Sequence, residues 1–388
     1  MKRQRKSLGE LCTIVKGTSP ISKTLPGPYP LVTTGEAHKT ADSFQFEDEA
    51  VCIPLISSTG HGHASLKRVH YQSGKFALAN LLAAAFVKDS SVLSTKFLAR
   101  YLMFSKDRLI VPLMTGATNM SISIDRLATV PIEFPPLTEQ ERIVKLLDEA
   151  DELRKLRTLA DRRSADLIPA LFHEMFGDPA TNEKDWPKGI IGSLVSEVRG
   201  GASLEPDDFV ESGFPILHKG AIKPAGKIRI DDKKKTFAPF EFAAANGRSR
   251  VNRDYIAVTL RDLAPSGPSI GLAADLRHGP FDEYLLAQGA YGFVLDESRC
   301  CREYFVWLSN MPSFRYELKR NSVGSTQIHI RTPVYLKILI PLPNLPLQQE
   351  FALRASEIRE LEAAQAASRH RVEHLFQSIQ HRAFNQEL

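Results

Sequence analysis

Basic side chains gather in one stretch of the chain, between Lys219 and Arg253. This stretch holds ten lysines and arginines against three acidic residues, a net charge of +7 in 35 residues, whereas the whole 388-residue chain carries only +5. Phe237, Phe240 and Phe242 lie among the cations. Lysine and arginine bind the phosphates and base edges of nucleic acids. The stretch therefore favours contact with nucleic acid over its alternative, a solvated and partly mobile loop.

The cations that we expect to contact nucleic acid all belong to this stretch: Lys219, Lys233, Lys234, Lys235, Arg248, Arg250 and Arg253. Two short polar pairs are further candidates, and each pair follows a glycine by two residues: Thr118, Asn119, Thr326 and Gln327. Asparagine and glutamine amides can hydrogen-bond adenine through two atoms, but a role in forming a turn is at least as well supported by the sequence.

The motifs that catalysis would require are missing from the sequence. It contains no GxxxxGKS or GxxxxGKT loop for nucleotide phosphates and no GxSxG nucleophile motif. It also lacks the Asn-Pro-Pro-Tyr or Asp-Pro-Pro-Tyr tetrapeptide of amino-methyltransferases. His61 and His63 stand without a third metal ligand nearby. We therefore predict that the chain is not an enzyme and binds neither a metal ion nor a cofactor.

Composition narrows the class of protein further. With 43% apolar and 24% charged residues, the chain is typical of a globular protein with more than one core. The four cysteines, Cys12, Cys52, Cys300 and Cys301, show no metal-ligand spacing, which predicts reduced thiols in a cytoplasmic protein. No apolar window of about 18 to 20 residues exists, so we expect no membrane span.

One sequence pattern occurs twice, over residues 8–176 and 191–384. Leu8-Gly9-Glu10-Leu11 corresponds to Ile191-Gly192-Ser193-Leu194 at an offset of 183, and Phe176 corresponds to Phe384 at an offset of 208. The pair Gln140-Glu141 aligns with Gln349-Glu350 at an offset of 209. The growing offset predicts an insertion in the second copy, between roughly 221 and 258, and this insertion coincides with the basic stretch.

The first copy differs in charge at the corresponding place. Its residues 36–53 contain one lysine and five acidic residues. The two copies therefore share a framework but present different surfaces.

Each copy is expected to fold as an α+β domain that ends in a long helix. Short apolar runs separated by glycine and proline predict strands over residues 8–135, and helices are expected at 94–107 and around 302–320. Thr138 and Glu141 form a capping-box signal after Pro135-Pro136.

Apolar residues at steps of three and four then predict an amphipathic helix to Phe176, with a kink near Pro169. A second helix is predicted from Leu347 to Phe384. Neither helix can bury its apolar stripe alone, so antiparallel packing of the two helices is expected, with the two copies related by a pseudo-two-fold axis.

The full pattern resembles the specificity (S) subunit of Type I restriction-modification systems over nearly the whole chain. The resemblance rests on the two module starts, on Gly116-Ala117-Thr118-Asn119 and Gly324-Ser325-Thr326-Gln327, and on the segment from Pro135 through Phe176-Gly177-Asp178-Pro179. It implies two target-recognition domains, at 1–136 and 179–346, each followed by a long spacer helix, at 137–178 and 347–388.

The resemblance also implies a function. Each recognition domain would read one half of a split, asymmetric sequence in double-stranded DNA, and the helices would set the spacing. The subunit would have no catalysis of its own and would hold two modification subunits, which methylate adenine with their own S-adenosylmethionine. The sequence leaves open whether a restriction subunit joins the assembly.

Two other interpretations of the sequence stay open. The chain could be an interaction scaffold of a defence complex that does not read DNA sequence, or, third, a nuclease. Salt-dependent and sequence-selective binding to duplex DNA separates a specificity subunit from the scaffold, and metal-dependent cleavage by the isolated chain would be needed for the nuclease.

Overall fold

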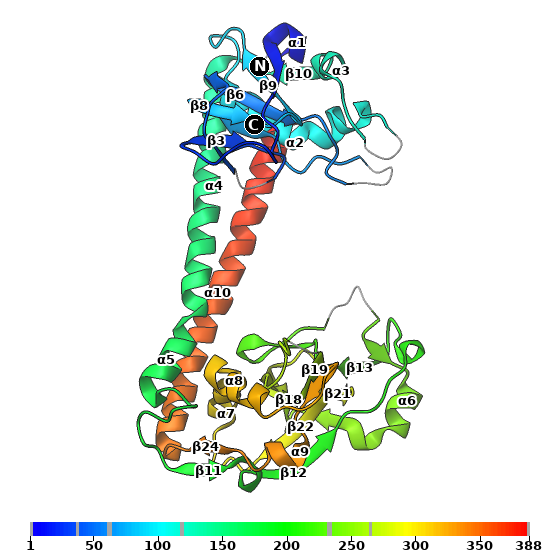
Figure 1. The fold of residues 1–388 in the computed structure, drawn as a ribbon, viewed down its shortest axis with the longest axis vertical. Coiled ribbons are helices and arrows are strands. Elements are labelled where there is room, and N and C mark those ends of the chain that lie inside the picture. The colour runs from blue at the N-terminus through cyan, green and yellow to red at the C-terminus, as the bar shows by residue number, and fades with distance from the viewer. Residues whose placement is uncertain are drawn as a thin grey trace. The chain divides into compact units, whose positions relative to one another are not determined.

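The computed structural model describes residues 3–35, 39–59, 64–116, 120–230, 235–263 and 266–385 (Figure 1). The chain divides into two compact units. The first unit contains residues 1–158 and 367–388, and the second contains residues 159–366. Within the described ranges, no helix is both long enough and apolar enough to cross a membrane.

Two four-stranded sheets form the centre of the first unit. One has the order β2 (Cys12–Lys16), β9 (Leu82–Val87), β6 (Ala50–Pro54) and β7 (His70–Gln72), all antiparallel. The other has the order β4 (Lys39–Ala41), β3 (Tyr29–Val32), β8 (Lys75–Leu78) and β5 (Phe46–Glu47), with β3 parallel to β8. Around them lie α1 (Leu8–Leu11), α2 (Thr95–Leu109), η1 (Val111–Leu113) and α3 (Ile124–Ala128), and β1 (Gln4–Ser7) pairs with β10 (Pro131–Phe134).

The second unit repeats this topology strand for strand. One of its sheets has the order β12 (Val195–Gly200), β22 (Ala290–Leu295), β18 (Ile256–Thr259) and β20 (Ala273–Asp275). The other has the order β16 (Phe237–Ala238), β13 (Phe214–Leu217), β21 (Glu283–Leu286) and β17 (Arg250–Asn252). Here β13 is parallel to β21, as β3 is to β8. β11 (Lys188–Ile190) pairs with β24 (Leu339–Pro341), as β1 does with β10. The expected α+β fold class and the internal repeat are therefore confirmed.

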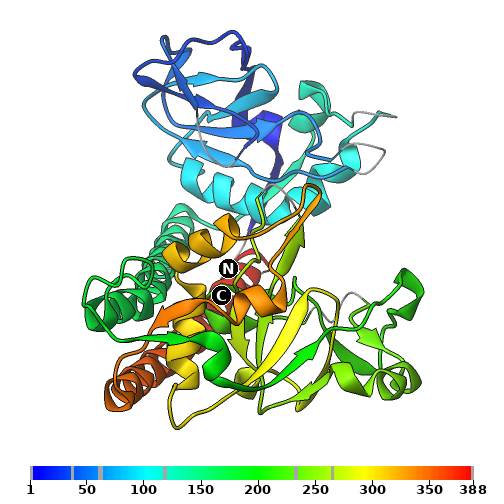
Figure 2. The ribbon, with the colours of Figure 1, turned by 60° about the horizontal axis from the view of Figure 1, so that its bottom comes forward.

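Helices complete the second unit: η2 (Ile191–Ser193), η3 (Pro206–Asp208), η6 (Leu276–His278), α7 (Arg302–Asn310), α8 (Pro312–Arg320) and α9 (Thr332–Tyr335). The single helix expected around 302–320 is two helices, because Pro312 cannot donate a backbone hydrogen bond and begins a new helix after Met311. In the second unit, the sheets lie between α5 (Leu167–Phe176) and the first part of α10 (Leu345–Phe384) on one side and α6 (Phe240–Ala245) on the other (Figures 1 and 2).

The insertion predicted in the second copy lies on both sides of β16. Residues 33–38 join β3 to β4, whereas residues 218–236 join β13 to β16 and form β14 (Ile222–Lys223), η4 (Pro224–Gly226) and β15 (Lys227–Ile228). Residues 239–249 add α6 (Phe240–Ala245) and η5 (Gly247–Ser249) before β17. Because η4 contacts α7 and β20, part of the basic stretch packs onto its own module.

The long helices are α4 (Leu137–Ala165), α5 (Leu167–Phe176) and α10 (Leu345–Phe384). The expected kink near Pro169 is a break between α4 and α5 at Asp166, because a proline cannot donate to the carbonyl four residues earlier and its ring clashes with that carbonyl. Gly177, with φ of 76°, ends α5 in a conformation that favours glycine.

Within each unit, the helices run antiparallel. In the first unit, Arg154 Nε lies 2.8 Å from Glu373 Oε2, and Arg157 donates to Ser368 Oγ at 2.9 Å. In the second unit, Ser164 Oγ donates to Gln365 Oε1 at 2.8 Å. The packing expected from the apolar stripes is present in both units.

The last turn of each helix completes a module core. Phe384 of α10 packs against Phe97, Tyr101 and Phe104 of α2, with ring centroids 5.2 to 5.9 Å apart. At the equivalent position, Phe176 of α5 packs against Phe172, Tyr304 and Phe351, with centroids 4.8 to 5.4 Å apart. Burial of these rings therefore joins each helix end to a sheet domain.

A buried glutamine attaches the start of each long helix to its module. The Gln140 amide oxygen accepts from Ser94 N at 2.8 Å, and its Nε2 donates to the carbonyls of Val92 and Pro135. Gln348 accepts from Cys301 N at 2.8 Å and donates to Pro343 O at 2.7 Å. The alignment of Gln140 with Gln349 was therefore wrong by one residue, because the buried amide fixes the equivalent position at Gln348.

Replacing Gln140 or Gln348 with leucine should lower the free energy of unfolding of the corresponding unit by about 1–3 kcal/mol, because backbone groups buried beside the amide would have no hydrogen-bond partner. Gln349 is exposed, so Gln349→Leu is the matched control and should change stability by less than about 0.5 kcal/mol. Urea unfolding of the three variants measures the difference. Equal stability of Q348L and Q349L would contradict the assigned role of Gln348.

Candidate nucleic-acid interface

Four of the predicted contact residues lie outside the described residues: Lys233, Lys234, Thr118 and Asn119. The structure places the other seven in the second unit, on three different elements and their loops. Their environments differ enough to separate structural cations from free ones.

Lys219 forms an ion pair inside the module. Its Nζ lies 3.1 Å from Oδ1 of Asp262, whose side chain is only 6% exposed. Asp262 also accepts from the backbone amides of Leu263 at 2.8 Å and Ser269 at 2.6 Å. Burial alone would raise the pKa of Asp262, but the hydrogen bonds from Ser269, Leu263 and Lys219 outweigh it and hold the pKa below its usual range. Lys219 therefore holds a loop in place as well as carrying charge.

Arg250 and Arg253 are also paired. Arg250 Nη2 lies 2.6 Å from Glu283 Oε2, and its guanidinium carbon lies 4.9 Å from the centre of the Phe214 ring. Arg253 Nε lies 2.9 Å from Asp282 Oδ1, and both side chains are exposed. To contact a phosphate, each arginine would have to divide its guanidinium between its acidic partner and the phosphate.

Lys235 and Arg248 remain available. Both residues are exposed, and neither has an ion-pair partner in the part of the chain that the structure describes. They are therefore the candidates in the basic stretch that can bind phosphate without giving up an internal ion pair.

The predicted residues do not form a single cluster. Because β13 and β21 run parallel, Lys219, which follows β13, lies beyond the carboxyl end of the sheet, while Arg253 and Asp282 lie at the amino end of β21. The predicted cations therefore do not form a single surface.

A two-stranded ribbon carries the second polar pair. β19 (Arg261–Leu263) pairs antiparallel with β23 (Gln327–His329), with Leu263 opposite Gln327 and Arg261 opposite His329. Thr326 and Gln327 are exposed, and Gly324, with φ of 121°, forms the turn that leads into β23. Thr326 and Gln327 thus join a ribbon that Lys219 supports through Asp262.

Sequence reasoning missed Arg261, Asp262 and Leu263. These three residues are polar, polar and apolar in order, a pattern that does not alternate and does not distinguish a strand from a loop.

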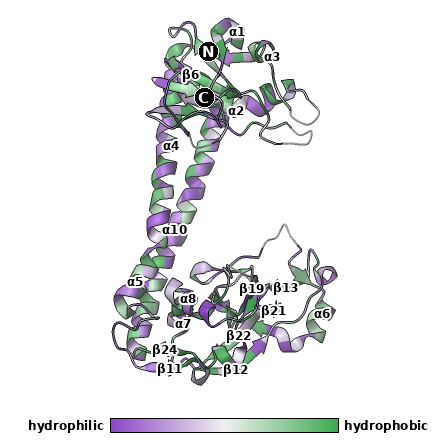
Figure 3. Cartoon of the chain, viewed as in Figure 1, coloured by the Kyte–Doolittle hydropathy of each residue, from purple (hydrophilic) through white to green (hydrophobic). Residues whose placement is uncertain are grey.

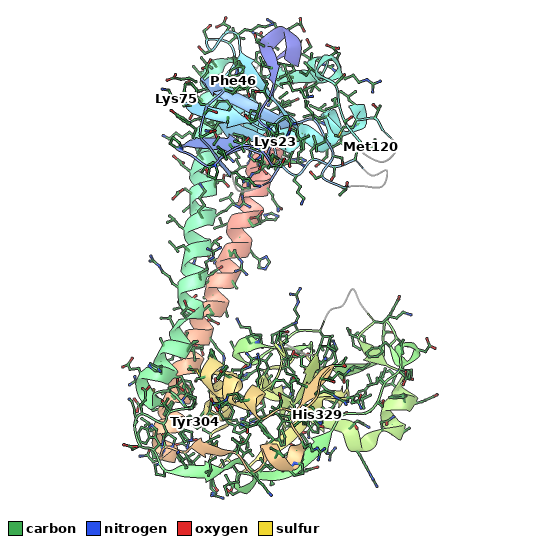
Figure 4. The ribbon with its side chains drawn as sticks, in the orientation of Figure 1. Lys23, Phe46, Lys75, Met120, Tyr304 and His329 are labelled. Atoms are coloured by element: carbon green, nitrogen blue, oxygen red, sulfur yellow. The ribbon has the colours of Figure 1, made fainter. Side chains whose placement is uncertain are left out.

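The first unit contains a hydroxyl cluster that the sequence analysis also missed. Ser65 N donates to Ser57 Oγ at 3.0 Å, and the hydroxyls of Thr59 and Ser65 lie 3.1 Å apart. Thr115 and Ser121 exchange two backbone hydrogen bonds beside it, and Ser57 N donates to Met120 O, whose residue is labelled in Figure 4. The available signal was three hydroxyl residues in a row, 57–59, directly after a buried strand.

Three of the four cysteines are buried thiols. Burial raises the pKa of the Cys12, Cys52 and Cys300 thiols to about 12, so these cysteines stay protonated near neutral pH and are poor nucleophiles. Within the described ranges, no group of three or more histidine, cysteine or acidic residues could hold a metal ion.

A pocket of about 500 Å³ beside Arg250 is lined by charges of both signs, including Glu197, Arg199 and Glu283. Burial and the neighbouring Glu197 raise the pKa of Tyr255 in this pocket to about 12. The arrangement can form hydrogen bonds and ion pairs.

Comparisons with known proteins agree with this picture. Residues 2–160 match the family model of the Type I restriction modification DNA specificity domain. The Type I restriction enzyme MjaVIII specificity subunit of Methanocaldococcus jannaschii is 25% identical over 245 residues, which cover 60% of this chain and 56% of that protein. The putative type I specificity subunit S.MpnORF285P of Mycoplasma pneumoniae is 27% identical over 156 residues, covering 37% of this chain and 46% of that protein. The alignments thus span about half the length of these relatives.

Solved structures share the fold. The S subunit of a Type I restriction-modification system from M. genitalium has a TM-score of 0.58 at 15% identity, covering 99% of this chain and 96% of that one. A chain from a study of complex assembly and conformational transition of the type I R-M system has a TM-score of 0.60 at 16% identity, covering 100% and 98%. The repeated α+β modules with their helices are thus the fold of these solved structures. Through this family match and these sequence relatives, the chain is similar to the specificity (S) subunits of Type I restriction-modification systems.

Proposed function

We propose that the chain reads a bipartite, asymmetric sequence in double-stranded DNA for a Type I restriction-modification complex. The observation that carries this proposal is the internal repeat. Two modules of one topology differ in the charge and length of the same connection, with six residues at 33–38 in the first module and the longer basic insertion in the second. Equal frames with different surfaces suit two different half-sites.

The exposed leucines of the helices support two docking sites for modification subunits. Leu153 and Leu375 in the first unit are 53% and 52% exposed, and Leu361 and Leu167 in the second unit are 48% and 43% exposed. The two pairs are equivalent at the offset of 208. α4 and α10 are otherwise largely hydrophilic, as Figure 3 shows. Exposed leucines at equivalent places on such helices are typical of protein contacts.

In this proposal the chain itself performs no chemistry. The modification subunits carry S-adenosylmethionine and methylate adenine, and the chain works in the cytoplasm, where its cysteines stay reduced.

The test is to express the chain with its neighbouring methyltransferase in a host without DNA methylation and to map methylated adenines across the genome by long-read sequencing. A bipartite motif with a fixed spacer is the expected result. A stable complex that methylates no motif would support the alternative, an interaction scaffold that does not read DNA sequence.

Reversing Lys235 and Arg248, the predicted contact cations that form no ion pair among the described residues, should weaken DNA binding. Replacing Lys235 and Arg248 with glutamate should reduce affinity at physiological salt roughly tenfold or more. It should also reduce the salt slope by about 1.8, because each cation that no longer neutralises a phosphate lowers the slope by about 0.9. Lys188 and Arg320 are exposed cations of the same unit outside the insertion, so K188E/R320E is the control. Fluorescence anisotropy over a salt series measures both effects. Identical slopes for the two double variants would remove Lys235 and Arg248 from the interface.

A further inference from the structure

The ribbon β19–β23 has one face toward its module and one face outward. Asp262 and Ile328 lie directly opposite each other in the register and point inward, where Asp262 binds Lys219 and the Ser269 amide. The next pair, Leu263 and Gln327, points outward: Leu263 is 56% exposed, and Gln327 is exposed as well. The strand alternation therefore places an apolar side chain beside an amide on the outer face.

The frame of the ribbon is held firmly. Val323 and His329 exchange two backbone hydrogen bonds of 2.9 Å, and Ile330 N donates to Leu260 O at 2.9 Å. The adjoining loop is held by Arg315, which donates to the carbonyls of Pro268 and Ile270. Figure 4 labels His329 on this ribbon. The outer side chains are thus carried by a backbone that is hydrogen-bonded to the rest of its module.

The outer face has unused binding capacity. Among the described residues, neither the Gln327 amide nor the Arg261 guanidinium has a hydrogen-bond or ion-pair partner. Leu263 exposes most of an isobutyl group to water, which costs free energy unless a partner covers it. An occupant of this face must therefore offer both a donor–acceptor pair and an apolar group.

An A·T base pair offers these groups together. In the major groove, adenine presents N7 as an acceptor and N6 as a donor, which match a glutamine amide, and thymine presents its C5-methyl group. The major groove also admits a two-stranded β-ribbon. No other base pair combines this amide match with a methyl group.

We propose that the ribbon β19–β23 reads an A·T pair in the half-site of the second module. Gln327 hydrogen-bonds adenine through N6 and N7, and Leu263 contacts the thymine methyl group. Lys219 and Asp262 are positioning residues that hold the ribbon. This inference rests on the proposed function and adds the identity of one base pair to it.

The test uses the full chain with its methyltransferase and a duplex that carries the mapped site. At each A·T pair of the second half-site, adenine is replaced by 7-deazaadenine or thymine by uracil, in separate duplexes. At one position, both analogues should weaken binding of the native complex, 7-deazaadenine by roughly tenfold or more. Gln327→Ala should remove the sensitivity to 7-deazaadenine at that position, and Leu263→Ala should remove the sensitivity to uracil. Gln349→Ala, an exposed glutamine of the same unit, should remove neither.

A gain-of-preference variant gives an independent readout. Gln327→Glu replaces the amide by an acceptor that suits the amino group of cytosine, so the methylated motif should change from A·T toward C·G at that one position. Selective binding by the native complex, with unchanged analogue sensitivity and an unchanged motif in the variants, would overturn the ribbon assignment and leave the proposed function standing. Loss of all sequence selectivity in the native complex would instead contradict the proposed function.

Discussion

Replacing Arg302 with methionine should lower the free energy of unfolding of the second unit by about 3–5 kcal/mol. The side chains of Arg302 and Asp275 are 3% and 4% exposed, and they form an ion pair through two hydrogen bonds. Arg302 Nη2 donates to Asp275 Oδ1 at 2.5 Å, and Arg302 Nε donates to Asp275 Oδ2 at 2.9 Å. The same guanidinium donates to the carbonyls of Arg253, Asp254 and Tyr255. Methionine fills the space but leaves a buried carboxylate and three carbonyls without this donor.

Asp275→Asn should cost less than Arg302→Met, because Arg302 keeps its three carbonyl acceptors. A control is Arg320→Met, which removes an exposed pair with Glu317 and should change stability by less than about 0.5 kcal/mol. Urea unfolding, monitored through a spectroscopic signal from the second unit, measures these differences in the free energy of unfolding. A loss of stability no larger for R302M than for R320M would show that the buried pair contributes little.

The same ion pair predicts a dependence on pH. Burial alone would raise the pKa of Asp275, but the hydrogen bond and charge of Arg302 outweigh it and lower the pKa below its usual range. A carboxyl with a lowered folded pKa stabilises the protein above its unfolded pKa of about 3.9 and loses this contribution as the pH falls through the folded value. The difference in stability between the native chain and D275N should therefore shrink as the solution is acidified below about pH 4.

Replacing Leu153 and Leu375 together with aspartate should reduce the complex from two modification subunits to one. These two leucines are exposed, so their replacement spares the core, but a buried carboxylate in a docked interface costs several kcal/mol unless it is paired. The equivalent change at Leu361 and Leu167 should remove the other subunit. Light scattering of the purified complexes counts the subunits.

Leu353 supplies the control for this experiment. It is 64% exposed on α10, but its equivalent in the first half is Lys145, so it belongs to no repeated pair. Leu353→Asp should leave both modification subunits bound. If the L153D/L375D variant still binds two modification subunits, the leucine pairs are not the docking sites.

The internal repeat and the long helices could be predicted from the sequence, because each copy provides an independent comparison for the other. Matching anchors, such as Phe176 and Phe384, placed equivalent elements without knowledge of either copy, and the structure confirms equivalent packing. The residue-level register was harder to obtain. Gln348 and Gln349 are identical in type, and only burial distinguishes the one that holds the helix. The domain boundaries at 136, 178 and 346 stay predictions.

The site was less predictable because charge in a sequence does not reveal its partner. Lys219 looks like its neighbours in the basic stretch, but the fold places its Nζ 3.1 Å from Oδ1 of Asp262, which lies 43 residues later in β19. Arg250 and Arg253 find Glu283 and Asp282 in the same way, through the pairing of β17 with β21. Contact residues can be proposed from composition, but separating them from structural ion pairs requires the fold.

The packing of Phe384 into the first unit affects the order in which the protein can mature on the ribosome. The second unit is one continuous segment and can fold once it has emerged, whereas the first unit needs residues 367–388, which are synthesised after it. Arg3 Nη2 donates to Ala383 O across 380 positions. Before residues 367–388 are synthesised, Phe97, Tyr101 and Phe104 lack the Phe384 ring, so the nascent first module exposes an apolar surface that favours aggregation. A chain that ends before residue 367 would keep that surface exposed.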